Sequence, residues 1–262
     1  MAEPVAGETP DLPSLFGLGG RVAIVTGGSR GIGLAIARGF AAAGAAVAVA
    51  SRKADACERA AAAIEATGGT ALAVPTQMSD LVAVAGLVER VVEGFGRIDV
   101  VVNNAANALA QPIGHITPEA WSKTQDTNER GPLFLVQAAL PQLTESPHAS
   151  VINMVSAGVF THGGYVAMYT AAKAGLLALT RSMAAELADR DIRVNALAPG
   201  PVDTDMVRHN PPEVQRRMAK APLMGRLAAP WEMVGPALFL ASDASSFVTG
   251  QVLVADGGLT FH

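Results

Sequence analysis

Short runs of apolar residues alternate with longer stretches of helical character along most of the chain, and this alternation predicts where strands and helices lie. In the first half, strands are predicted over Val22–Val25, Ala46–Ala50, Ala71–Pro75 and Val100–Asn103. The helices predicted between them are Gly31–Ala43, Lys53–Ala66 and Leu81–Phe95. Ser79 and Asp80 are candidate caps for the last of these helices.

The second half continues the same alternation. Helices are predicted over Leu133–Leu143 and Tyr169–Leu187, and strands over Val151–Met154, Val194–Ala198 and Val252–Ala255. Because the strand runs are mostly apolar and show no alternation of apolar and polar residues, both faces of each strand are expected to be covered, as in a parallel sheet. The sequence therefore predicts an α/β fold, a single doubly wound (Rossmann-type) domain with a seven-stranded parallel sheet flanked by helices. Ligands are expected at the carboxyl ends of its strands.

Two segments fall outside the alternation. Residues 1–18 are predicted to be a poorly specified lead-in, and residues 19–262 to form the domain. Between residues 203 and 227 the sequence is rich in Met and interrupted by Pro. A long insertion after a strand is placed to act as a lid. Its apolar residues predict an adaptable, apolar pocket; they are Met206, Val207, Met218, Leu223 and Met224.

Composition narrows the class of partner. Half of the 262 residues are hydrophobic and only 16% are charged, which is enough to bury a large core in one domain. The formal charge is −4 and the basic residues are scattered, so nucleic acid and anionic membranes are not expected as partners. The longest apolar stretch, Gly39–Ala50, is too short to cross a bilayer.

Cysteine and histidine usage adds two further expectations. Cys57 is the single cysteine, so no disulfide forms within the chain, and no signal peptide is visible. We therefore expect a cytoplasmic protein in which Cys57 is a small helix residue. No metal site is expected, because the histidines show no ligand spacing; they are His115, His148, His162, His209 and the terminal His262.

A glycine-rich turn follows the first predicted strand and opens the first long helix. It consists of Thr26, Gly27, Gly28, Ser29, Arg30, Gly31, Ile32 and Gly33. In this context backbone amides and a helix N-terminus can receive a pyrophosphate. The turn alone is weak evidence, because glycine-rich turns between a strand and a helix also serve packing.

Tyr169 and Lys173 stand one helical turn apart, downstream of Ser156. Positions i and i+4 share a helix face, and a nearby ammonium lowers a phenol pKa from its usual value of about 10. Such a tyrosine can donate or accept a proton near neutral pH. Ser156 can donate a hydrogen bond to a carbonyl oxygen as it gains charge. These residue types predict reduction of a carbonyl or oxidation of an alcohol.

The glycine turn and the Tyr-Lys pair together closely resemble the short-chain dehydrogenase/reductase family, and the resemblance runs from about Arg21 to Gly258. Further segments match the family's motifs in order. Asn103-Asn104-Ala105 is similar to the family's Asn-Asn-Ala-Gly segment, although Ala106 replaces the glycine. Asn128 matches the active-site asparagine. The segment Pro199-Gly200-Pro201-Val202-Asp203-Thr204 resembles the part that cradles a nicotinamide.

The resemblance implies roles for these residues. Ser156, Tyr169, Lys173 and Asn128 would be catalytic, with Tyr169 and Lys173 also contacting the cofactor, Lys173 at the nicotinamide ribose, and Asn128 holding a water that relays a proton. The remaining matches would contact the cofactor, and the residues so implied are Gly27, Ser29, Arg30, Gly31, Ile32, Gly33, Asn104, Ala105, Ala106, Pro199, Gly200, Val202 and Thr204.

The end of the second predicted strand indicates which dinucleotide binds. An NAD enzyme typically has an acidic residue there, whereas a 2′-phosphate needs cations. This chain has Ser51 followed by Arg52 and Lys53, which favours NADP, with NAD as the alternative. Arg30 adds weak support. Gln77 and Met78 occupy the place where the family usually has an aspartate that touches the adenine, and the Gln77 amide could replace it.

The sequence leaves alternatives open. A cofactor-binding sensor that has lost turnover is disfavoured by the intact catalytic set, and reduction of an enoyl double bond is disfavoured by the four-residue spacing of Tyr169 and Lys173. A 3-oxoacyl thioester is a possible substrate, because Arg190 matches a carrier-docking position, although residues 145–148 supply no second Arg or Lys. Tyr165 is predicted to be pocket wall.

The resemblance also implies a homotetramer. Three stretches are richer in apolar and small residues than one core-facing stripe requires, which is consistent with closed two-fold assembly. They are Leu133–Leu143, Leu176–Leu187 and Phe239–Val254.

Overall fold

The computed structural model describes residues 11–260. Its strands form one parallel sheet in the order β3-β2-β1-β4-β5-β6-β7. The strands are β1 (Val22–Thr26), β2 (Ala46–Ser51), β3 (Thr70–Pro75), β4 (Val100–Asn103), β5 (Ser150–Met154), β6 (Arg193–Pro199) and β7 (Val252–Ala255). The doubly wound fold and its seven-stranded sheet are therefore confirmed, with each strand end within about one residue of its predicted place.

The predicted helices are also present, and their ends shift by a few residues. They are α2 (Gly31–Ala42), α3 (Ala54–Glu65), α4 (Leu81–Phe95), α6 (Gly131–Glu145) and α7 (Ala167–Leu187). The described residues also form helices that were not predicted: α1 (Leu12–Phe16), α5 (Pro118–Gln125), α8 (Asp205–Arg208), α9 (Pro212–Lys220) and α10 (Val234–Ala241). Within residues 11–260, no helix is long and apolar enough to span a membrane.

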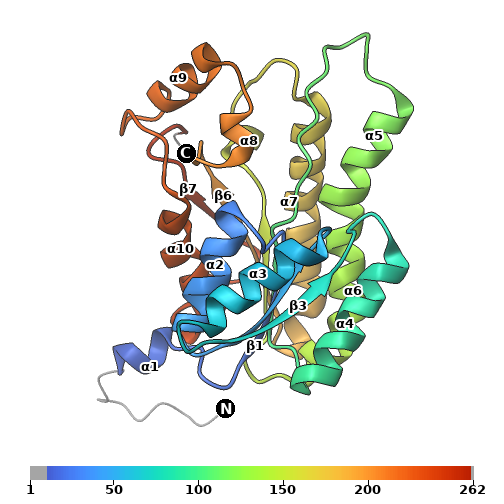
Figure 1. Ribbon diagram of the computed structural model, residues 1–262, viewed down its shortest axis with the longest axis vertical. Coiled ribbons are helices and arrows are strands. Elements are labelled where there is room, and N and C mark those ends of the chain that lie inside the picture. Colours follow the sequence, from blue (N-terminus) through green and yellow to red (C-terminus); the bar gives the residue numbers. More distant parts are fainter. Residues whose placement is uncertain (1–10, 261–262) are drawn as a thin grey trace.

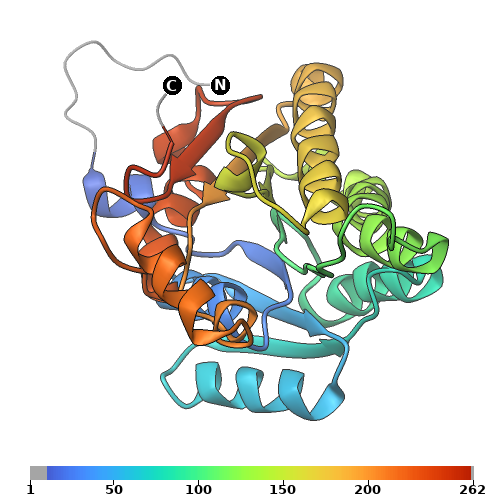
Figure 2. The ribbon, with the colours of Figure 1, turned by 90° about the horizontal axis from the view of Figure 1, so that it is seen from above.

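Alternate residues of each strand face opposite layers of helices, as β1 illustrates. Val22 and Ile24 belong to a core cluster with residues of α4, α6 and α7. Ala23 and Val25 belong to a second cluster with residues of α2, α3 and α10. Figure 2 shows these two helix layers on either side of the sheet. Burial on both faces explains why the strand sequences are largely apolar and do not alternate with polar residues.

Helix α4 shows how local sequence sets the element ends. The Asp80 carboxylate accepts hydrogen bonds from the backbone amides of Val82 and Ala83, at 2.9 and 3.2 Å, so Asp80 is the N-cap. Gly96 ends the helix with a φ of 78°, a left-handed conformation that favours glycine. Of the two predicted caps, Asp80 is the one that the structure uses.

The predicted lead-in is partly structured. Residues 1–10 lie outside the described residues. Asp11 caps the short helix α1, whose Ser14 amide donates to the Asp11 carboxylate at 3.2 Å. Leu18 is fully buried and packs in the core on the α2 face. The chain from Asp11 onward is therefore attached to the domain.

The lid segment forms helices α8 and α9 after the carboxyl end of β6. In Figure 1 these helices lie at the same end of the molecule as the loops that lead to α5 and α7. The predicted site residues also follow strand ends: the glycine turn follows β1, Ser51 ends β2, Asn104 follows β4, and Ser156 follows β5. One edge of the sheet thus gathers the candidate chemistry.

Candidate active site

Ser156, Tyr169 and Lys173 come together where β5 ends and α7 begins. Lys173 is only 1% exposed, and its Nζ donates a hydrogen bond of 2.6 Å to the backbone oxygen of Met154, the last residue of β5. The same Nζ lies 5.8 Å from the centroid of the Tyr169 ring. The helical spacing that the sequence shows therefore places both side chains on the face of α7 that meets the strand ends.

Burial dominates the acid/base properties of this pair. It lowers the pKa of Lys173 from its usual value to about 7, because a buried ammonium loses hydration. Burial also raises the pKa of Tyr169, and a hydrogen bond with Ser156 acts in the opposite direction. The sequence predicted that Lys173 lowers the tyrosine pKa. In this structure the hydrogen bond with Ser156 is the effect that lowers the pKa of Tyr169, and burial outweighs it; the Lys173 ammonium donates to the Met154 carbonyl instead.

Asn128 is fully buried in η1 (Asp126–Arg130), a π-helical turn between α5 and α6. Its Nδ2 donates to the backbone oxygens of Asn107 and Thr124, both at 2.8 Å. Its Oδ1 accepts from the Asn107 amide at 3.2 Å. The side chain therefore fastens the loop after β4 to the helix beside α7, which fixes one wall of the site.

The turn after β1 has the shape that a dinucleotide pyrophosphate requires. Gly27 and Gly31 have φ values of 64° and 55°, which favour glycine. A Cβ on Gly33 would lie 2.4 Å from both Asn104 Nδ2 and Gly27 O, so a side chain there would displace the loop. Helix α2 begins without a side-chain cap, and its first amides remain directed at the turn. These features fit an anionic ligand.

Thr26 locks this turn to the loop after β4, a role that the sequence analysis did not assign. The Thr26 hydroxyl accepts hydrogen bonds from the amides of Asn104 and Ala105, both at 3.0 Å. The Asn104 side chain donates to the Thr26 backbone oxygen at 2.8 Å. Ala106 is exposed beside them. The predicted adenosine-side segment is thus held directly against the glycine turn.

The other turn residues differ in their surroundings. Ser29 is half-buried, and Ile32 packs against the core on the α2 face. Arg30 forms an ion pair with Asp205 at the start of α8, with 2.9 Å between the charged atoms. Because Arg30 is already paired with the lid, it gives less support to phosphate binding than its sequence position suggested.

The end of β2 carries the residues predicted to select the dinucleotide. Arg52 and Lys53 are exposed, and the Arg52 guanidinium has no partner among the described residues. The Ser51 hydroxyl lies 3.2 Å from the Cys57 thiol, which is buried in α3 as expected. An unpaired cation next to a small hydroxyl residue can receive a 2′-phosphate.

The side chains of the loop after β3 offer less to a cofactor than the resemblance implied. Gln77 is exposed, and its amide donates to the Ser79 hydroxyl at 2.7 Å. The Met78 side chain is only 4% exposed and packs in the core on the α4 face. Any contact of Met78 with a cofactor would therefore come from its backbone.

The segment after β6 leads into the lid. Pro199 ends the strand, and a Cβ on Gly200 would lie 2.7 Å from the Asp256 Cα, so only glycine fits there. Val202 is buried, and Thr204 lies against the glycine turn, 3.3 Å from the place of a Cβ on Gly31. The predicted nicotinamide cradle therefore borders the predicted pyrophosphate turn.

Tyr165 lies in the loop before α7, with a φ of 68° and 66% of its surface exposed. Its backbone oxygen accepts a hydrogen bond of 2.8 Å from the amide of Gln111, in the loop after β4. The two loops that border the catalytic residues are therefore joined, and the Tyr165 side chain is largely exposed to solvent.

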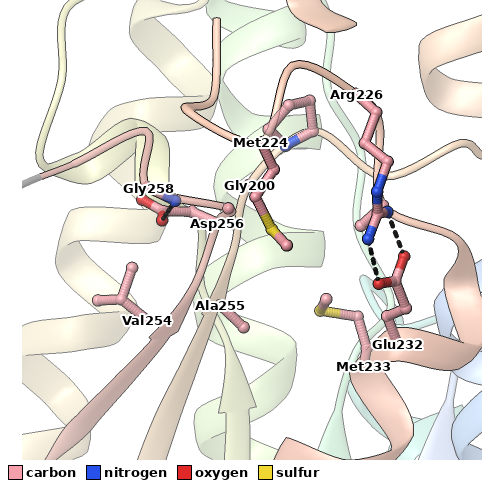
Figure 3. Close-up of a pocket in the computed structure, with 12 residues that line it drawn as sticks. Gly200, Met224, Arg226, Glu232, Met233, Val254, Ala255, Asp256 and Gly258 are labelled. Carbon is pink, nitrogen blue, oxygen red and sulfur yellow. Dashed lines mark hydrogen bonds and ion pairs between the residues drawn. The ribbon is translucent and has the colours of Figure 1, made fainter.

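A pocket of about 310 Å³ opens beside this segment, at the carboxyl ends of β6 and β7. In Figure 3, Met224 and Met233 line it, next to an ion pair between Arg226 and Glu232 with 2.7 Å between charged atoms. Hydrogen bonding to Arg226 lowers the pKa of Glu232 to about 2. Of the predicted catalytic and cofactor-binding residues only Gly200 lines this pocket, together with the predicted lid residue Met224, so the pocket does not contain the catalytic residues.

Within residues 11–260, His, Cys, Asp and Glu side chains do not gather into a group of three that could hold a metal ion. Metal-independent catalysis remains a prediction from the residue types at the site.

Comparisons with known proteins agree with this geometry. The family model described as enoyl-(acyl carrier protein) reductase matches residues 27–260. A cis-4-hydroxycyclohexanecarboxylate dehydrogenase of Sinomonas cyclohexanicum is 39% identical over 241 residues, covering 92% of this chain and 96% of that protein. An L-rhamnose 1-dehydrogenase (NAD(P)⁺) of Azotobacter vinelandii is 39% identical over 246 residues, covering 91% and 96%.

A solved structure of similar fold is a 3-oxoacyl (acyl-carrier-protein) reductase of Agrobacterium tumefaciens C58 with NADP bound. It has a TM-score of 0.89 and 35% identity, covering 97% of this chain and all of that one. The fold, the site and these similarities define a dinucleotide-dependent oxidoreductase. The chain belongs to the short-chain dehydrogenase/reductase family, as the resemblance predicted, and it is therefore an enzyme of the alcohol/carbonyl type.

Proposed function

We propose that the protein transfers a hydride between NADP(H) and a carbonyl/secondary alcohol pair, with Ser156, Tyr169, Lys173 and Asn128 as its acid/base set. The observation that carries the proposal is the convergence of Ser156, Tyr169 and the buried Lys173 at the end of β5. A dinucleotide-binding sensor has no need of a buried lysine beside a tyrosine, because burying an ammonium lowers stability.

When bound, the nicotinamide supplies or accepts the hydride. Tyr169 donates its phenolic proton to the carbonyl oxygen during reduction and takes it back during alcohol oxidation. The Ser156 hydroxyl stabilises the charge that develops on that oxygen, and its hydrogen bond with Tyr169 favours loss of the phenolic proton. Lys173 holds a proton close to neutral pH, since its pKa is about 7, and can therefore exchange it with Tyr169.

The residues expected to hold the cofactor lie along the strand ends described above. The uncapped N-terminus of α2 would receive the pyrophosphate, and the Pro199, Gly200, Val202 and Thr204 segment would border the nicotinamide. Incubating the pure protein with NADPH and a panel of keto esters, ketosteroids, quinones and acyl thioesters tests turnover. Tight NADPH binding without oxidation of the cofactor by any substrate would favour the sensor alternative.

NADPH should be preferred over NADH, and the preference should depend on Arg52. The 2′-phosphate carries nearly two charges, and the unpaired Arg52 guanidinium can meet it with paired hydrogen bonds. Arg52→Ala is expected to weaken NADPH binding by roughly ten- to over a hundredfold, the loss of about 1.5–3 kcal/mol for one charge-assisted contact. NADH binding should hardly change, and titration calorimetry of both cofactors measures the difference.

Arg59→Ala is the matched control for this test. Arg59 is exposed on α3, the helix that follows Arg52 in sequence, and is paired with Asp55 one helical turn away, so its removal also takes one positive charge from this part of the chain. It should leave both affinities within about twofold, because screened surface charges contribute little. Equal losses for NADPH and NADH in Arg52→Ala would mean that Arg52 supports the fold and does not recognise the phosphate.

Two other reactions are weighed against this proposal. A 3-oxoacyl thioester is favoured by the similarity to the Agrobacterium reductase, and Arg190 is exposed after α7, where a carrier could dock. The cluster at 145–148 nevertheless contributes no Arg or Lys. The matching family model is described as enoyl reductase, but Tyr169 and Lys173 keep the spacing expected of carbonyl reduction.

We expect the protein to be a homotetramer in the cytoplasm. Small residues form an exposed stripe along α7, where a second helix could pack closely; they are Ala171, Ala174, Ala178, Ser182 and Ala185. Phe247, before the edge strand β7, is fully exposed. Light scattering at micromolar concentration should give four times the mass of the chain, and a monomer would contradict the hypothesis.

A substitution in the proposed α7 interface tests the homotetramer directly. Ala178→Arg places a long charged side chain in the centre of the α7 stripe and should reduce the measured mass by half or more. Ala85→Arg on α4 is the control, because Ala85 is equally exposed on a helix that the hypothesis leaves facing solvent.

A further inference from the structure

The thiol of Cys57 contacts Ser51, the residue proposed above to lie beside the 2′ group of the cofactor. Its Sγ is 3.2 Å from the Ser51 hydroxyl oxygen and 3.4 Å from the Ser51 backbone oxygen. Cys57 is fully buried on α3, whereas Ser51 is half-buried at the end of β2. The hydrogen bonding of Ser51, at the end of β2, is therefore set partly by the buried thiol of Cys57.

Hydrogen counting fixes the direction of these two contacts. A thiol has one proton, and a carbonyl oxygen only accepts. If the thiol donates to the Ser51 carbonyl, which also accepts from the Thr76 amide at 2.8 Å, the Ser51 hydroxyl must be the donor toward sulfur. This is the one arrangement in which both contacts are hydrogen bonds. The Ser51 hydroxyl then presents only lone pairs to the cofactor.

A hydroxyl that can only accept distinguishes the two dinucleotides. The 2′-hydroxyl of NAD(H) is a donor and matches it, whereas the 2′-phosphate of NADP(H) has only acceptor oxygens near neutral pH and needs donors. To donate to the phosphate, Ser51 must first give up its hydrogen bond to Cys57. The thiol thus opposes the contribution that Arg52 makes to NADPH preference.

We propose that Cys57 is a positioning residue which, through Ser51, lowers the preference of this enzyme for NADP(H) over NAD(H). The inference rests on the proposed function, since it requires that dinucleotides bind at the end of β2. Cys57→Ala frees the Ser51 hydroxyl. The ratio of the Kd for NADH to the Kd for NADPH should then rise by roughly three- to tenfold, the effect of one modest hydrogen bond.

Titration calorimetry of both cofactors would measure this ratio in wild type, Cys57→Ala, Cys57→Ser and Ser51→Ala. Cys57→Ser should keep the wild-type ratio within about twofold, because its hydroxyl also accepts from Ser51. In the Ser51→Ala background, Cys57→Ala should leave the ratio unchanged. If Cys57 acts only through packing, Cys57→Ala should change the Kd of both cofactors equally, or should shift the Kd ratio even in the Ser51→Ala background. Either result overturns the proposal.

Infrared spectroscopy provides a second test on the free protein. Cys57 is the single cysteine, so one S–H stretching band reports on it. If the thiol donates to the backbone oxygen, Ser51→Ala should leave the band in place; a shift to the position of a free thiol would overturn the assigned direction. Failure of wild type to bind either dinucleotide would refute the proposed function and this inference together, whereas binding with an unaltered ratio in Cys57→Ala refutes this inference alone.

Discussion

Replacing Tyr169 with phenylalanine is expected to lower kcat by about a thousandfold or more, the range found when a key general acid or a member of a coupled set is removed. The ring stays and keeps its packing on α7, while the phenolic proton and the hydrogen bond with Ser156 are lost. NADPH should still bind, because the glycine turn and the end of β2 do not depend on the phenol. Steady-state assays on the best substrate, with calorimetry of NADPH, measure both quantities.

The second tyrosine of the chain supplies a matched control. Tyr165→Phe removes a phenol four residues earlier, from a side chain that is 66% exposed, and should leave kcat within about threefold. Turnover of Tyr169→Phe within tenfold of wild type would remove Tyr169 from the mechanism. A comparable loss of kcat in both variants would point instead to the loops ahead of α7.

The fold could be predicted from sequence because strands buried on both faces leave a simple pattern. Val22–Val25 is apolar throughout and Val100–Asn103 is apolar up to its last residue, and each is followed by a turn of small and polar residues. Helix α5 was missed although Thr117 and Pro118 supply an N-cap and a first-turn proline. Its own residues are mostly polar, so hydrophobic periodicity gave no signal there.

The catalytic residues were predictable because their spacing lies within one helix or one loop. What the sequence could not give is the direction in which each side chain's polar atoms point. Asn128 uses its whole amide to hold Asn107 and Thr124, and Lys173 donates to a backbone carbonyl. Every residue has a backbone carbonyl and nearly every residue a backbone amide, so the sequence does not reveal which of them a side chain will bind. Only the folded structure shows these partners.

The residues proposed to select the cofactor also make contacts that the sequence could not show. Ser51, Arg52 and Lys53 are adjacent in sequence and were found together, whereas Cys57 meets Ser51 only because α3 folds back on β2. Asp205 likewise reaches Arg30 from a distant part of the chain and pairs with it. Contacts between elements therefore modify the roles of residues whose identities the local sequence reveals.

Lys173→Met is expected to lower kcat by a thousandfold or more and, at the same time, to change how stability depends on pH. Activity falls because Tyr169 loses its buried partner for proton exchange. Wild-type Lys173 has a pKa of about 7 when folded, against about 10.4 for an unfolded lysine. Between these values the unfolded chain binds one more proton than the folded chain, so this lysine makes the free energy of unfolding rise with pH.

Lys173→Met has no titrating group at this position, so its free energy of unfolding lacks this contribution to the pH dependence. The free energy of unfolding of wild type minus that of Lys173→Met should therefore rise between about pH 7 and 9.5, by up to about 1.4 kcal/mol per unit, and should be flat below about pH 6. The Met154 carbonyl loses its donor in the variant at every pH, which shifts the difference by a constant and leaves its slope unchanged. Urea titrations of both proteins across this range measure the slope.

Lys123→Met, which removes an ammonium exposed on α5, should give a flat difference throughout. A flat difference for Lys173→Met as well would show that Lys173 is protonated in the folded protein at neutral pH and above, and would leave its role in proton exchange without support.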